Sequence, residues 1–102
     1  MNIGNFFLMT KDQLADLTEK IKTADLPATV TLERHGLELI ATIKKWPGTS
    51  ELQFVVQNSH GMLEIRLVEK RYSPLHAMGG IDKKLWPPLY DAVTDVGGKV
   101  FV

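Results

Sequence analysis

The chain contains no cysteine among its 102 residues. Disulfide scaffolds, thiol nucleophiles and zinc or iron–sulfur sites with cysteine ligands are therefore excluded. No apolar run approaches the ~20 residues that a membrane-spanning helix needs. Neither charge is in excess, because 12 basic side chains balance 12 acidic ones. This balance argues against a general coat for polyanions. The motifs of phosphate-binding loops, dinucleotide-binding folds, serine hydrolases and zinc proteases are absent as well.

The composition is typical of one globular domain. Hydrophobic residues make up 44% of the chain and charged residues 24%, and the length fits a single α+β domain over residues 1–102 with one modest core. The first residues carry neither a basic stretch nor a small-residue cleavage site, so we expect a cytoplasmic protein. Nothing points to a cofactor, and we expect a binding protein rather than an enzyme.

Helix signals stand near both ends of the chain. The segment Thr10-Lys11-Asp12-Gln13 has the pattern of a capping box, in which a threonine and a glutamine cap each other's backbone. Apolar residues then recur at helical spacing until Pro27, which predicts a helix over residues 11–24. A second helix is predicted towards the C-terminus, with Pro87 and Pro88 in its first turn.

Between these helices the hydrophobic period changes to two, which is typical of half-buried strands. Four stretches alternate in this way: residues 28–33, 37–44, 52–57 and 63–68. Short turns at 35–36, 47–50 and 58–61 favour an antiparallel meander. We therefore expect an α+β fold in which an N-terminal and a C-terminal helix pack on one face of a four-stranded antiparallel meander. Lys99–Val102 should form a short C-terminal strand that covers one edge, and Phe6–Leu8 is a short strand or a flap over the core.

Strands two and four of a meander run in the same direction, so their last residues meet at one end of the sheet, about 10 Å apart. Two similar segments stand there, and a third follows them; each has two cations, an aromatic residue and a proline. The segments are Lys44-Lys45-Trp46-Pro47, Lys70-Arg71-Tyr72-Ser73-Pro74 and Lys83-Lys84-Leu85-Trp86-Pro87. Their cationic and aromatic members are here called the basic-aromatic rim: Lys44, Lys45, Trp46, Lys70, Arg71, Tyr72, Lys83, Lys84 and Trp86.

Three interpretations fit this rim. Trp, Tyr and Arg are frequent anchors of protein interfaces, which favours a protein-binding module that acts as a regulator, an inhibitor or an assembly adaptor. Cations beside flat rings also suit phosphates and stacked bases, so nucleic-acid binding through the same residues is the alternative. In the third interpretation Trp46, Tyr72 and Trp86 only close the core, and the lysines are solvated ends of elements. We expect protein binding.

The polar face of the meander contains two aliphatic residues. If Leu32 faces Leu39 and Ala41 faces Phe54, then Ile40 and Val55 lie in one row between polar neighbours. Such a small apolar centre is ordinary surface or a contact patch for a second copy of the chain. A symmetric homodimer through Ile40 and Val55 is therefore a further hypothesis.

His35 and His60 stand at the other end of the sheet, each just before a glycine and near glutamates. Two histidines and a carboxylate are able to bind a metal or transfer protons. Both histidines lie in turns, however, and a metal needs three or four convergent ligands with supporting contacts. We expect no metal site.

Overall fold

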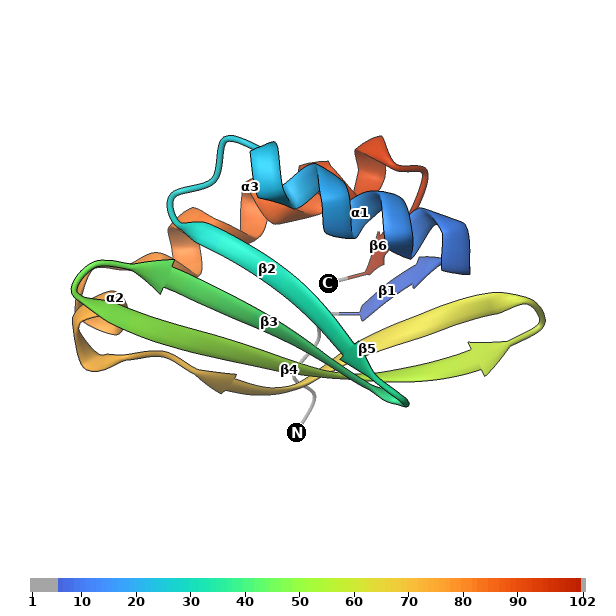
Figure 1. Ribbon diagram of the computed structural model, residues 1–102, viewed down its shortest axis with the longest axis horizontal. Helices are drawn as coiled ribbons and strands as arrows, with labels where there is room; N and C mark the ends of the chain where they lie inside the picture. The colour runs from blue at the N-terminus through green and yellow to red at the C-terminus, as the bar shows by residue number, and fades with distance from the viewer. Residues whose placement is uncertain (1–5, 102) are drawn as a thin grey trace.

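The computed structural model describes residues 6–101 and shows an α+β fold with an antiparallel sheet (Figure 1). Within this range no helix is long and apolar enough to cross a bilayer. In chain order the elements are β1 (Phe6–Met9), α1 (Lys11–Thr23), β2 (Thr29–His35), β3 (Glu38–Lys45), β4 (Gly48–Ser59), β5 (Met62–Arg71), α2 (Pro74–Met78), α3 (Ile81–Asp95) and β6 (Lys99–Phe101).

The sheet has six strands in the order β2-β3-β4-β5-β1-β6. The expected meander is present as β2 to β5, but the prediction of a four-stranded sheet is wrong. β1 pairs with β5, and β6 pairs with β1, so the two ends of the chain add two strands beyond the meander. Short strands of three or four residues carry little periodic signal, and their long-range partners cannot be read from local spacing. Val102, which was expected to end the last strand, lies outside the described residues.

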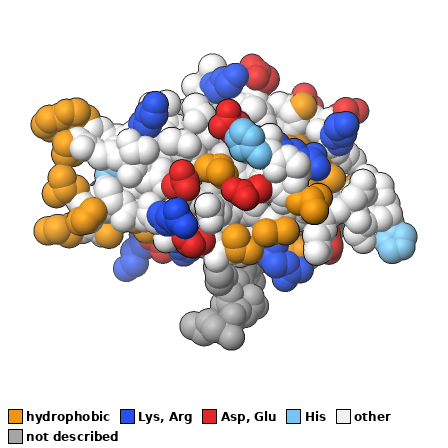
Figure 2. Space-filling model, turned by 60° about the horizontal axis from the view of Figure 1, so that its bottom comes forward, with side chains coloured by type: hydrophobic (Ala, Val, Ile, Leu, Met, Phe, Trp, Pro, Cys, Tyr) orange, Lys and Arg blue, Asp and Glu red, His pale blue; other side chains and the backbone are white. Residues whose placement is uncertain are grey.

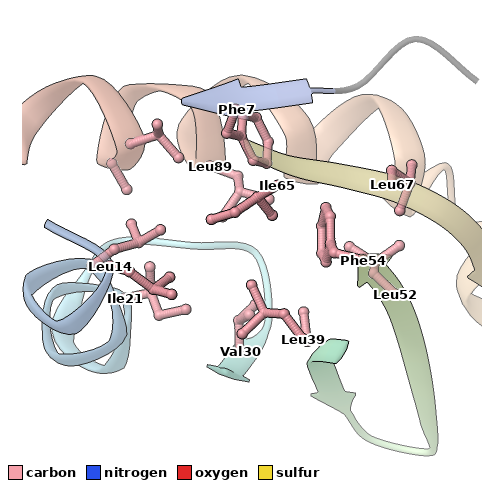
Figure 3. Packing of buried hydrophobic residues seen from close by; sticks show 14 of the residues in the cluster. Phe7, Leu14, Ile21, Val30, Leu39, Leu52, Phe54, Ile65, Leu67 and Leu89 are labelled. Atoms are coloured by element: carbon pink, nitrogen blue, oxygen red, sulfur yellow. The ribbon is translucent and has the colours of Figure 1, made fainter. Parts of the chain in front are cut away.

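The helices α1 and α3 lie on one face of the sheet, and the hydrophobic core fills the space between the layers (Figure 1). Leu14 and Ile21 of α1 point toward Val30 and Leu39 of the sheet (Figure 3). In the described part of the chain no helix packs on the opposite face of the sheet (Figure 1), so the strands alternate between buried and more exposed residues. This alternation is the physical origin of the period-two pattern in the sequence.

The N-terminal helix begins where the capping box predicts. The Gln13 backbone N–H donates to Thr10 Oγ1 at 3.1 Å, and the Thr10 backbone N–H donates to Gln13 Oε1 at 2.9 Å. The helix ends at Thr23, one residue before the predicted end. These reciprocal bonds satisfy two backbone groups that a helix start would otherwise leave unpaired.

The C-terminal helix begins earlier than predicted. α3 starts at Ile81, so Pro87 and Pro88 lie inside the helix and not in its first turn. A proline cannot donate the backbone hydrogen bond of a helix interior. The buried stripe that includes Ile81 and Leu85 begins before the prolines, and its burial against the sheet offsets those missing bonds.

The register of the meander differs from the expected one by two residues. The turn between β2 and β3 is formed by residues 36–37 instead of 35–36, so Leu32 lies opposite Ala41 and not opposite Leu39. Ala41 in turn lies opposite Leu52 and not opposite Phe54. A shift of two keeps every apolar side chain on the core face, which is why periodicity alone does not distinguish the two registers.

Candidate functional site

The first two segments of the basic-aromatic rim lie at the same end of the sheet. β4 runs between them: Lys45 of β3 is opposite Gly48 at the start of β4, and Arg71 of β5 is opposite Glu51 of β4. Lys44, Lys45 and the following turn are exposed. This end of the sheet therefore carries both expected clusters, although they differ in what they contact.

The second segment is held by a residue that the sequence did not single out. Asp82, in the first turn of α3, accepts hydrogen bonds on Oδ1 from Lys70 Nζ at 3.0 Å, Tyr72 OH at 2.6 Å and Trp86 Nε1 at 2.8 Å. Trp86 is only 5% exposed and belongs to the core. Lys70 and Tyr72 therefore help to fasten α3 to the end of β5, and Trp86 is not available as a surface anchor.

The charge of Asp82 is favoured by these donors. Burial raises the pKa of the Asp82 carboxyl, but the hydrogen bonds from Tyr72, Lys70 and Trp86 outweigh burial and hold that pKa below its usual value. The pKa of Tyr72 is raised, first by burial of its hydroxyl and then by the hydrogen bond that it donates to Asp82. The folded state thus favours an ionised aspartate beside a neutral tyrosine.

The cations of the second segment also have intramolecular partners. Lys70 Nζ lies 5.5 Å from the centroid of the Trp86 ring, and Arg71 forms an ion pair with Glu69. The other four cations of the rim are exposed, and in the part of the chain that the structure describes none of them forms an ion pair. These four are Lys44, Lys45, Lys83 and Lys84.

Three exposed hydrophobic side chains gather beside these lysines. Trp46 is 93% exposed, Met78 is 84% exposed and Leu75 is 55% exposed. Trp46 lies in the turn between β3 and β4, and the other two lie on α2. Figure 2 shows hydrophobic side chains gathered at the left end of the molecule, where Figure 1 places α2 and this turn. We call Trp46, Leu75 and Met78 the Trp46 patch.

A cleft of about 190 Å³ opens within this region. The turn between β3 and β4, the helix α2 and the first turns of α3 all contribute to its walls. Its lining consists of Lys45, Trp46, Pro47, Leu75, His76, Gly79, Ile81 and Lys84. The cleft thus brings the first and third segments of the rim together, around an apolar surface and two lysines.

Buried polar contacts place α2 beside the turn. His76 Nε2 donates to the Lys45 carbonyl at 2.8 Å, and His76 Nδ1 accepts from the Ser50 hydroxyl. The Ser50 Oγ in turn accepts from the Ser73 backbone N–H at 2.9 Å. Gly48 permits this approach, since a Cβ there would lie 2.8 Å from the Ser73 Oγ. His76 itself is buried, with 5% of its surface exposed.

The contact between Ser50 and His76 has the residue types of a nucleophile and its base. A nucleophile must reach its substrate, however, and Ser50 is only 1% exposed. Its hydroxyl is also used as an acceptor by the Ser73 backbone. The pair therefore fixes α2 and does not present a reactive oxygen to solvent.

No family model matches this chain, and no curated protein or solved structure is detectably similar to it. What the site does must therefore follow from its own chemistry.

Ile40 and Val55 lie on the uncovered face of the sheet but are not opposite each other. Ile40 is flanked across the strands by Glu33 and Gln53, whereas Val55, at 37% exposure, pairs with Glu38 and Arg66. The apolar centre is therefore divided by polar side chains, and self-association through it stays a prediction.

His35 and His60 lie at the end of the sheet opposite the Trp46 patch. His35 Nε2 is 3.2 Å from Glu33 Oε1 on the surface, and His60 occupies the β4–β5 turn with a φ of 54°. Among residues 6–101 no three histidine, aspartate or glutamate side chains converge in a way that could hold a metal ion.

Proposed function

We propose that this protein is a protein-binding module, acting as a regulator, an inhibitor or an assembly adaptor, and that it docks through the Trp46 patch. The observation that supports this function is the exposure of Trp46 and Leu75, which line one cleft, and of Met78, which lies in the same helix as Leu75. A tryptophan side chain that is almost fully exposed loses hydrophobic stabilisation in the free protein, and contiguous exposed apolar surface marks interaction sites. Tryptophan is also enriched among the residues that dominate binding energy.

The lysines around the patch serve as its charged rim in this proposal. Lys44, Lys45, Lys83 and Lys84 are exposed, as is common at the edge of a protein interface, where charges steer association and set its salt dependence. No enzymatic step is part of the proposed function. The proposed location of the protein is the cytoplasm, because a chain without cysteine forms no disulfides and needs no oxidising compartment.

Nucleic-acid binding is supported less well than protein binding. That alternative needs several cations and stacking rings along one path. Lys70 and Tyr72 are instead bonded to Asp82, and Trp86 is buried. Trp46 is then the one ring of the rim that remains highly exposed, which suits an apolar anchor better than a stacking platform.

The proposed function is tested by affinity capture from the native host with three forms of the full chain. Wild type and Leu37→Ala should retain the same captured protein, and Trp46→Ala should lose it. Leu37 is a suitable control because it is 68% exposed in the β2–β3 turn, at the other end of the sheet. The captured protein is then purified and its binding to each variant is measured directly. Equal binding by wild type and Trp46→Ala would contradict the proposal.

A further inference from the structure

The cleft beside Trp46 has a size and a charge that constrain its occupant. We infer that it receives a short acidic segment of a protein partner, which inserts one large apolar side chain between the β3–β4 turn and α2. This inference rests on the proposed function and specifies the chemistry of the partner at the same site.

The dimensions of the cleft favour a side chain over a small-molecule ligand. Its volume of about 190 Å³ lies below the roughly 300–1,000 Å³ of pockets that enclose a drug-sized molecule. Part of the cleft wall is apolar, formed by Trp46, Pro47, Leu75 and Ile81. Transfer of an aliphatic or aromatic side chain from water to this wall is therefore favourable. Trp46 and Leu75 also extend outward, which gives the flanking backbone of a bound segment apolar surface to lie on.

The charges around the cleft favour acidic flanking residues. Lys45 and Lys84 line it, and Lys44 and Lys83 are their exposed neighbours in the chain. No aspartate or glutamate is among the residues that line the cleft in the described part of the chain. The first turn of α3 adds the partial positive charge of a helix N-terminus on the same side. Carboxylates on both sides of an inserted apolar residue would complement this arrangement.

The acidic side chain in the first turn of α3 does not cancel this positive field. Asp82 follows Ile81 in α3, but its Oδ1 is already bonded to Lys70, Tyr72 and Trp86. Lys70 compensates its charge through an ion pair at 3.0 Å. The exposed lysines at the cleft are therefore left to an external anion.

The test selects ligands from a library of random short peptides displayed against the full chain. Enriched peptides should carry net negative charge and at least one large apolar residue, and they should not be enriched on Trp46→Ala. Enriched peptides are then synthesised, and binding is followed through the fluorescence of Trp46, which should shift to shorter wavelength as the ring leaves water. Trp86→Phe isolates this signal, because it leaves Trp46 as the remaining indole.

The variants give graded expectations for the affinity of these peptides. Trp46→Ala should weaken binding about 30-fold, as expected for a central anchor. Lys45→Glu and Lys84→Glu should each weaken it about threefold to fivefold, and added salt should reduce this difference. Lys11→Glu, which makes the same charge change at the exposed start of α1, should leave the affinity within about twofold.

The outcomes separate this inference from the proposed function. Peptides that need Trp46 but are neutral or basic, or that bind Lys45→Glu and Lys84→Glu as tightly as wild type, would overturn the acidic partner and leave protein docking in place. A library that yields no Trp46-dependent peptide also overturns the inference, whereas the capture experiment tests docking by itself. Tight, steeply salt-dependent binding of an oligonucleotide that quenches Trp46 would replace the peptide with a nucleic acid.

Discussion

Replacing Asp82 with alanine is expected to loosen the attachment of α3 to the sheet. Asp82 Oδ1 is a shared acceptor for Lys70, Tyr72 and Trp86, so one substitution removes three hydrogen bonds. The matched control is Asp12→Ala. Asp12 is the acidic residue in the first turn of α1, as Asp82 is in α3. Within residues 6–101 the side chain of Asp12 has no counterpart of the three hydrogen bonds that Asp82 accepts.

The expected cost is about 2 kcal/mol of unfolding free energy, which is less than the sum of three charged hydrogen bonds at 1.5–3 kcal/mol each. Two features reduce it. The side chains of Lys70 and Asp82 are 32% and 50% exposed, and ion pairs that solvent reaches in this way contribute about 0–1 kcal/mol. The indole N–H of Trp86 also keeps a second acceptor, the Tyr72 hydroxyl at 3.2 Å. Asp12→Ala should cost only about 0.3–1 kcal/mol through the helix dipole.

The effect of Asp82 should depend on pH in one direction. The pKa of Asp82 is lower in the folded protein than in the unfolded chain, so the folded state favours the ionised form. Its contribution is fully present above the unfolded pKa of about 4 and is lost as the pH falls through the folded pKa. The difference between wild type and Asp82→Ala should therefore shrink in acid.

Urea unfolding followed by circular dichroism measures these free energies at neutral and acidic pH. A loss of 2 kcal/mol corresponds to a fall in melting temperature of roughly 8–16 °C for a domain of this size. The reasoning fails if Asp82→Ala and Asp12→Ala differ by less than about 0.5 kcal/mol at neutral pH, or if their difference grows in acid.

Three further predictions concern other parts of the molecule. His76→Ala should cost about 2 kcal/mol, because it leaves the buried Ser50 hydroxyl and the Lys45 carbonyl without their partner, and amide exchange in α2 should become faster; unchanged exchange would contradict this. The raised pKa of Tyr72 means that its neutral form stabilises the fold below about pH 10 and that this contribution is lost as the pH rises further. The free energy of unfolding of Tyr72→Phe should therefore fall less than that of wild type above about pH 10, and parallel plots of this free energy against pH would be evidence against it. The proposed homodimer should give twice the mass of one chain by light scattering and a single-chain mass for Val55→Lys; one chain's mass in both samples would refute it.

Local signals predicted the elements well. The capping box at Thr10 and Gln13 places the start of α1 correctly because both partners lie within one helical turn. The period-two stretches predict the four central strands because each needs one buried face. The place of β1 in the sheet could not be predicted because its partner β5 is distant in the chain: Phe7, for example, lies opposite Ile65. The C-terminal strand was expected at an edge of the sheet, and it lies there as β6, paired with β1.

The candidate site was predicted in part. The run from Lys44 to Trp46 stands at the expected end of the sheet, since strand direction follows from a meander. The sequence could not show that Trp46 and Trp86 differ in exposure. Residues 44–47 and 83–87 have a similar pattern of two lysines, a tryptophan and a proline, but the tryptophan lies in a turn in the first segment and in a helix in the second. Asp82 and His76 gave no signal, since a single polar residue shows its partners only after folding.

The link from His76 to Ser50 and Lys45 also has a thermodynamic consequence for recognition. Trp46 and Leu75 come from segments far apart in the chain, yet their spacing is already set by buried hydrogen bonds in the free protein. A ligand that meets such a preorganised surface pays little entropy to order it. Association should then resemble rigid-body docking, and a change at His76, which lines the cleft, should weaken binding by releasing α2.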